Sequence, residues 1–174
     1  MTLDENLATP AISSKHSAAI KRHIETIRKK YTEKGLNTEV KRGGEVLLVT
    51  LPTDSLFVPN GEELLPQAYS LLNYFKQAIN HPESYRIVVA VHTDDTGDKQ
   101  YSYAITQRRA EVILNFFNRI VDEDIVTPNI DYYWLGRDDF KVPNNTMKNR
   151  SANRRVEIYI VPEAHIIKAT NSNH

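Results

Sequence analysis

The sequence predicts an α+β fold: a mixed β-sheet with helices packed on one face, preceded by an N-terminal helix and a hairpin strand. Long segments with apolar residues at helical spacing alternate with short apolar runs, and the connections are short and polar. Hydrophobic residues make up 40% of the chain and charged residues 25%, the balance of a globular protein. No run of 18 apolar residues occurs that would cross a bilayer.

We expect four segments in the 174 residues. Residues 1–14 are polar and predicted to be a disordered leader. Residues 15–44 hold the first helix and a hairpin strand, residues 45–162 form the main domain, and residues 163–174 form a polar tail.

The first helix is predicted over residues 17–33 because four apolar residues share one face: Ile20, Ile24, Ile27 and Tyr31. Five basic residues lie on its outer face: Lys21, Arg22, Arg28, Lys29 and Lys30. Such a face is usually only solvated, and a role in binding a partner protein or a membrane surface is the alternative.

The next segments predict a hairpin and a second helix. Residues 37–41 and 45–51 flank Arg42-Gly43-Gly44, a hairpin signal, and we expect core contacts from Val46, Leu48 and Leu51. Residues 65–79 repeat apolar side chains at helical spacing, with a proline tolerated in the first turn.

A strand, a polar loop and a helix follow within residues 86–117. The apolar run 87–91 predicts a buried strand, residues 92–98 a loop, and a helix begins with Ser102 or Thr106 as N-cap. Two more strands are predicted at 131–136 and 155–161, the last with one buried face because apolar residues alternate with Glu157 and Tyr159.

Composition excludes several functions. The 22 basic and 22 acidic residues cancel, which argues against a general nucleic-acid binder. Cysteine is absent, so disulfides and cysteine-ligated metals are excluded. The first residues lack the basic and apolar regions of a secretory signal.

A carboxylate and an arginine lie where a site is expected. Asp94 follows the end of a strand and Arg109 lies in the next helix, and loops at strand ends often carry ligand sites. If the two side chains converge, the arginine binds a carboxylate and the aspartate an ammonium, as an amino-acid headgroup requires. The alternative is a plain Asp94–Arg109 salt bridge that pins the loop to the helix.

Catalysis has weaker support. His92, Asp94 and Asp95 resemble metal ligands, but adjacent side chains on an extended segment point in opposite directions and no second ligand cluster follows. No phosphate loop, dinucleotide-binding glycine motif or serine nucleophile motif occurs. We therefore predict no enzyme, metal or cofactor, and keep a metal-dependent hydrolase as a minor alternative.

Two motifs resemble those of OmpA-like domains. The first is carried by His92, Thr93, Asp94, Gly97, Tyr101, Ile105, Thr106, Arg108, Arg109 and Ala110. The second is the closing run Asn153, Arg154, Arg155, Val156, Glu157 and Ile158. The resemblance covers about residues 45–162 and implies a βαβαββ sandwich.

The resemblance also implies a function and a site. It indicates that Asp94 and Arg109 bind the diaminopimelate of the peptidoglycan stem peptide, with Thr93, Asp95 and Ser102 lining the same groove, and that Arg154 and Arg155 are largely structural. Ser102 stands where the family usually has Asn. The alternative is an OmpA-like fold that serves as an assembly module without wall binding.

The same resemblance implies a location and partners. We expect a periplasmic chain associated with the outer membrane or cell envelope, and therefore a fragment that lacks its signal or anchor. The expected partner is the stem peptide, with no nucleic acid; envelope proteins that bind the basic N-terminal helix, and a homodimer, are further expectations.

Overall fold

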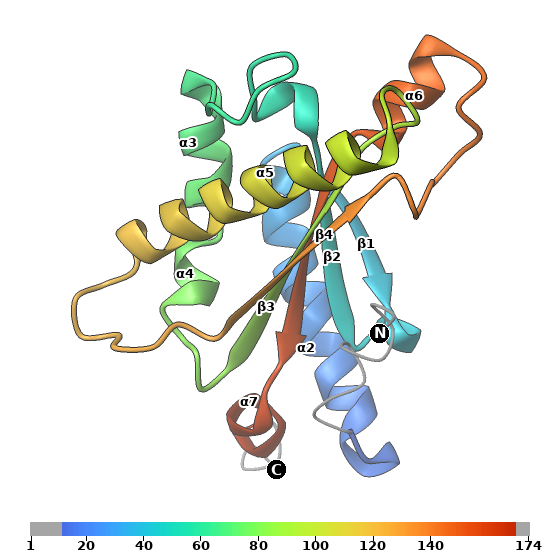
Figure 1. Cartoon of the computed structure of the whole chain (residues 1–174). Helices are drawn as coiled ribbons and strands as arrows, with labels where there is room; N and C mark the ends of the chain where they lie inside the picture. The colour runs from blue at the N-terminus through green and yellow to red at the C-terminus, as the bar shows by residue number, and fades with distance from the viewer. Residues whose placement is uncertain (1–11, 170–174) are drawn as a thin grey trace.

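The computed structural model describes residues 12–169. Five strands form one sheet in the order β1-β2-β5-β3-β4 (Figure 1). The strands are β1 (Asn37–Lys41), β2 (Val46–Pro52), β3 (Tyr85–His92), β4 (Ile130–Gly136) and β5 (Arg155–Pro162). The helices are α2 (Ser14–Glu33), η1 (Arg42–Gly44), η2 (Thr53–Ser55), α3 (Pro66–Asn73), α4 (Lys76–Ile79), α5 (Lys99–Ile120), α6 (Met147–Asn153) and α7 (Ala164–Ala169).

The predicted mixed sheet is confirmed. β3 pairs with β4 in parallel, whereas β1–β2, β2–β5 and β5–β3 are antiparallel. The predicted hairpin joins β1 to β2. From β2 onward the order is strand, helices, strand, helix, strand, short helix, strand. This is the expected βαβαββ arrangement with one addition, the short helix α6 between β4 and β5, where a loop was predicted.

One face of the sheet packs against the helices and forms the main core. The strands contribute alternate residues: Leu47, Val49 and Leu51 from β2, Ile87, Val89 and Val91 from β3, and Val156, Ile158 and Ile160 from β5. Buried side chains of α2, α3, α4 and α5 meet them in one cluster. The prediction that helices pack on one face is therefore confirmed.

The other face is also buried at its centre, which corrects two expectations. Val46 and Leu48 lie there, opposite to Leu51, because strand side chains alternate and residues 46 and 51 cannot share a face. All eight residues of β5 are buried, not one face of it. β5 is the middle strand of five, so side chains of β2 and β3 flank it on both faces. On the second face Tyr159 and Val161 pack in one cluster with Val46, Leu48, Val88 and Ala90.

Helix boundaries differ in two places. The N-cap of α5 is Asp98, whose side chain accepts a hydrogen bond from Tyr101 N at 2.7 Å; the prediction of Ser102 or Thr106 was wrong because both lie inside the helix. The apolar stretch 65–79 forms two helices, α3 and α4, separated at Tyr74 and Phe75.

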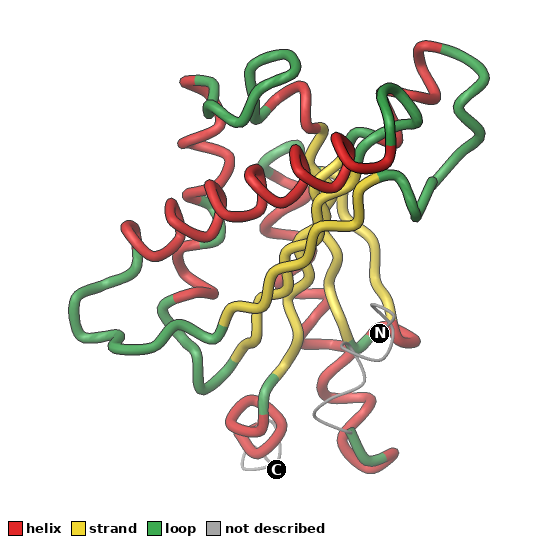
Figure 2. The backbone as a smooth tube through the Cα atoms, in the orientation of Figure 1, coloured by secondary structure: helices red, strands yellow, loops and turns green. Residues whose placement is uncertain are grey.

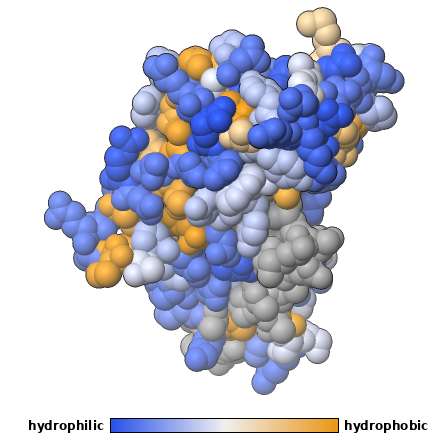
Figure 3. Space-filling model, viewed as in Figure 1, coloured by the Kyte–Doolittle hydropathy of each residue, from blue (hydrophilic) through white to orange (hydrophobic). Residues whose placement is uncertain are grey.

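The first and last described helices, α2 and α7, extend the domain, and residues 170–174 of the predicted polar tail lie outside the described range. Of the predicted leader, residues 1–11 lie outside the described range, and α2 begins at Ser14. A short helix, α7, lies in the segment predicted as a polar tail. The face of the molecule in Figure 3 is largely hydrophilic, with apolar surface in separate patches. Within residues 12–169 no helix combines the length and the apolar character that crossing a membrane requires.

Candidate ligand-binding site

The register of three neighbouring strands gathers the site residues at one end of the sheet. Pro52 at the end of β2 and His92 at the end of β3 both pair with Arg155, the first residue of β5. The next residues outward are therefore neighbours: Thr53 and Asp54, Thr93 and Asp94, and Arg154. The loops that carry them lie at the end of the sheet where α5 begins (Figure 2).

Asp94 is held by two hydrogen bonds in a nearly closed position. Its side chain is 4% exposed, one carboxylate oxygen accepts from Thr96 N at 2.8 Å, and the other accepts from Arg154 Nη1 at 2.7 Å. Burial alone would raise the pKa of Asp94, but the hydrogen bonds from Arg154 and Thr96 outweigh it and lower the pKa. Asp94 is therefore ionised near neutral pH.

Arg154 joins Asp94 to a second carboxylate, Asp54. Its Nε and Nη2 atoms donate to the two oxygens of Asp54 at 3.1 and 2.8 Å, a bidentate geometry. These hydrogen bonds lower the pKa of Asp54. One guanidinium therefore faces two carboxylates, and the trio carries one net negative charge.

Arg109 reaches the same place from α5. It is 5% exposed, donates from Nε to Gly61 O at 2.8 Å, and stacks over the Phe57 ring at 5.2 Å. Burial lowers its pKa, although nearby Tyr101, Asp54 and Glu62 act in the other direction. No carboxylate among residues 12–169 forms an ion pair with it. Arg109 is thus a buried cation whose charge is not matched by a direct partner.

The alternative of an Asp94–Arg109 salt bridge is wrong. Asp94 pairs with Arg154 instead, because strand register places Arg154 beside it. Asp94 and Arg109 nevertheless line one cavity of about 400 Å³. Its wall consists of Thr53, Asp54, Phe57, Val58, Pro59, Asn60, Thr93, Asp94, Thr96, Tyr101, Ile105, Arg109 and Arg154.

Of the five predicted site residues, Asp94, Arg109 and Thr93 line this cavity, and Asp95 and Ser102 do not. Asp95 accepts from Arg150 Nε at 3.0 Å. Ser102 is fully buried, and its hydroxyl donates to Asp98 O at 2.9 Å within the first turn of α5.

The sequence did not lead us to expect that Thr53, Asp54 and Arg154 line the cavity. Thr53 Oγ1 is buried without a hydrogen-bond partner among the described residues, so the cavity wall keeps an unused hydroxyl. The run Asp54-Ser55-Leu56-Phe57 after a predicted strand was the signal that pointed to this loop.

His92 belongs to a buried polar network on the other face of the sheet. Its Nε2 lies 3.3 Å from Glu157 Oε2, and Glu157 also accepts from Arg155 Nε at 2.8 Å and from Tyr159 Oη at 2.7 Å. Burial would raise the pKa of Glu157, but His92, Arg155 and Tyr159 lower it. Arg155 therefore fixes the start of β5, as expected of a structural residue. In the part of the chain that the structure describes, no three His or acidic side chains are grouped to hold a metal.

The fold is an α+β domain with a mixed five-stranded sheet, and its candidate site offers a cation, Arg109, and an excess carboxylate. Family comparison agrees: the model of the OmpA family matches residues 56–154, more than half of the chain. The chain therefore belongs to the OmpA family.

The individual relatives share 30% or less of their sequence with the chain. The chain is 30% identical over 108 residues to the outer-membrane lipoprotein YfiB of Pseudomonas aeruginosa, a match that spans 62% of each protein. A putative MotB-like protein from Desulfovibrio vulgaris has a TM-score of 0.71 and 23% identity, covering 85% of this chain and 99% of its own. The cell wall anchor of the T6SS from Pseudomonas aeruginosa has a TM-score of 0.62 and 18% identity, covering 84% and 96%. The two structural similarities establish the fold.

Proposed function

We propose that the chain binds peptidoglycan through the diaminopimelate of the stem peptide, without acting on it as an enzyme, and so anchors an envelope protein or assembly to the cell wall. The observation that carries the proposal is the buried, unmatched Arg109 in one cavity with Asp94. A buried charge without a partner is costly, so the site favours a ligand that supplies an anion.

Charge in the pocket matches a zwitterion. The free end of diaminopimelate carries an ammonium and a carboxylate on one carbon. Arg109 would bind the carboxylate through its terminal nitrogens, because Nε is already used by Gly61. The net negative charge shared by Asp54, Asp94 and Arg154 would balance the ammonium.

Envelope relatives support the location. YfiB is an outer-membrane lipoprotein and the T6SS protein is a cell wall anchor. By analogy we place this chain in the periplasm, associated with the outer membrane or cell envelope. The match spans less than two thirds of YfiB, so the assembly that the domain serves is part of the proposal.

The test is a calorimetric titration with a diaminopimelate stem peptide and, separately, with its lysine counterpart, which lacks the side-chain carboxylate. We expect selective binding of the first. Arg109→Ala should weaken binding of the diaminopimelate peptide about tenfold or more, whereas Arg108→Ala should not, because Arg108 is 45% exposed and does not line the cavity. Equal binding of both peptides, or undiminished binding by folded Arg109→Ala, would refute the proposed site.

A second function is favoured by one observation, the basic outer face of α2. Among residues 12–169, Lys29 and Lys30 on this face form no ion pair, whereas Arg28 pairs with Glu25. Failure to bind either peptide, together with capture of an envelope protein through α2, would favour an assembly module that lacks wall affinity.

A further inference from the structure

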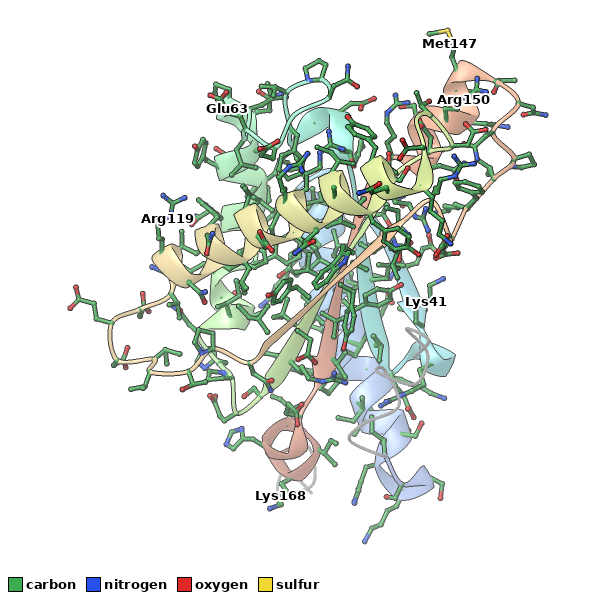
Figure 4. The ribbon with its side chains drawn as sticks, in the orientation of Figure 1. Lys41, Glu63, Arg119, Met147, Arg150 and Lys168 are labelled. Carbon is green, nitrogen blue, oxygen red and sulfur yellow. The ribbon has the colours of Figure 1, made fainter. Side chains whose placement is uncertain are left out.

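A second cavity, of about 470 Å³, lies at the opposite end of the sheet. It is bounded by the second half of α2, by α4, by the turn before β3 and by α7. Tyr85, in its wall, begins β3, whereas the Asp94 loop follows the end of that strand. The two cavities therefore lie at opposite ends of β3, which is about 23 Å long at 3.3 Å per residue. Figure 4 shows the separation through Lys168 on α7 and Arg150 on α6.

The floor of this cavity is apolar. Ile27, Tyr31, Ala78 and Ile160 line it, and the last three are at most 6% exposed. Its volume lies in the range of about 300–1,000 Å³ that is usual for small-ligand sites. The floor is therefore suited to an apolar chain and not to a sugar or a bare ion.

The rim is basic. Lys30, Lys34, His81 and His165 line the opening, and Glu83 is the single acid among the lining residues. Glu83 already accepts from Ser84 Oγ at 3.0 Å and lies 3.2 Å from His81 Nδ1. It therefore does not neutralise the lysines.

The two lysines lack a carboxylate partner in the described part of the chain. Lys34 Nζ stands over the Tyr74 ring, 4.4 Å from its centre, a contact that holds the ammonium at the mouth without neutralising it. Lys30 forms no ion pair within residues 12–169 and lies one helical turn before Lys34, on the same side of α2.

We propose that this cavity binds an anionic amphiphile: a single apolar chain on the floor formed by Ile27, Tyr31, Ala78 and Ile160, with a carboxylate head held between Lys30 and Lys34. The apolar floor and the two lysines together determine which ligand the cavity selects. The apolar floor excludes small hydrophilic anions, and the unpaired ammonium groups favour an anionic head over a neutral one. The proposal does not depend on wall binding, because the two cavities share no residue.

The experiment is calorimetric titration of the full chain with dodecanoate below its micelle concentration, and with dodecyl maltoside as an uncharged head on the same chain. We expect binding of dodecanoate alone. Vesicles of phosphatidylglycerol, offered separately, show whether the site also takes an acyl chain from a bilayer. Retention on vesicles without binding of monomeric dodecanoate would overturn the proposal, as would equal binding of the two soluble probes or of neither.

Two variants test the place of binding. Lys30→Gln with Lys34→Gln should weaken dodecanoate binding about tenfold or more, whereas Lys15→Gln with Lys29→Gln, an equal charge change on exposed positions of α2, should not. Ala78→Leu should also reduce binding by filling the floor, provided that its melting curve shows a folded protein. If both double variants bind alike, the site is not at this rim.

Discussion

Replacing Arg154 with methionine tests the electrostatic account of the pocket. The change keeps most of the side-chain length and removes three hydrogen bonds, two to Asp54 and one to Asp94. Asp94 would then remain buried with only Thr96, through its N–H and its side chain, to stabilise the charge. We expect Arg154→Met to be less stable than the parent at neutral pH.

The size of the expected loss in stability depends on how exposed the paired side chains are. Asp54 is 53% exposed, so its share of the interaction is screened and worth about 0–1 kcal/mol. Asp94 is 4% exposed and Arg154 30%; breaking a well-buried pair costs about 3–5 kcal/mol, and the exposed edge of Arg154 lowers that figure. We therefore expect a loss of about 2–4 kcal/mol in the free energy of unfolding.

The stability loss of Arg154→Met should also depend on pH. In the parent, the lowered pKa of Asp94 contributes stability above about pH 4 that is lost as the pH falls further. In Arg154→Met the desolvated carboxyl should have a raised pKa, so its contribution to stability should fall as pH rises from 4 to 7. The deficit should thus be largest at pH 7 and smaller at pH 4.

The assay is urea denaturation at pH 7 and pH 4, with Arg150→Met as matched control. Arg150 pairs with Asp95 at 3.0 Å, but the side chains are 40% and 33% exposed, so about 0–1 kcal/mol is expected. A loss for Arg154→Met no larger than that of the control, or one that grows at pH 4, would refute the reasoning.

Three further predictions concern the scaffold, and urea denaturation measures each. Phe117→Ala, a fully buried position beside Phe75 and Phe116, should cost about 3–5 kcal/mol; a loss below 1 kcal/mol contradicts this packing. Asp98→Ala should cost about 1 kcal/mol as the N-cap of α5, and an unchanged midpoint contradicts the cap. Asn153→Ala removes four hydrogen bonds, with Lys141 N, Val142 N, Val142 O and Asn144 Oδ1, and should cost about 4 kcal/mol at ~1 kcal/mol each; an unchanged free energy of unfolding would contradict these contributions.

Local patterns predicted most of the fold. The hairpin signal, an apolar run, aromatic content, and alternating or helical spacing located all five strands and the helices α2 and α5, since those signals depend on neighbouring residues. They could not show that β5 lies in the middle of the sheet, because strand order depends on pairing between distant segments. The burial of Glu157 and Tyr159 was missed for that reason.

The site was predicted in part for the same physical reason. Asp94, Thr93 and Arg109 belong to one strand–loop–helix segment, so the local sequence was enough to predict that they lie close together. Arg154 lies 60 residues beyond Asp94, and only the antiparallel register of β3 and β5 brings it there. Ser102 was expected in the groove, but the N-cap at Asp98 turns its hydroxyl back onto the helix.

In the proposed function, Arg109 binds a carboxylate and Asp94 attracts an ammonium on one ligand. It is tested most directly by measuring the affinities of the parent and Arg109→Ala for stem peptides ending in diaminopimelate and in lysine. We expect Arg109→Ala to weaken binding of the diaminopimelate peptide about tenfold or more and to leave the weak binding of the lysine peptide unchanged. An equal loss for both peptides would contradict it, because Arg109 would then support the pocket without contacting the carboxylate.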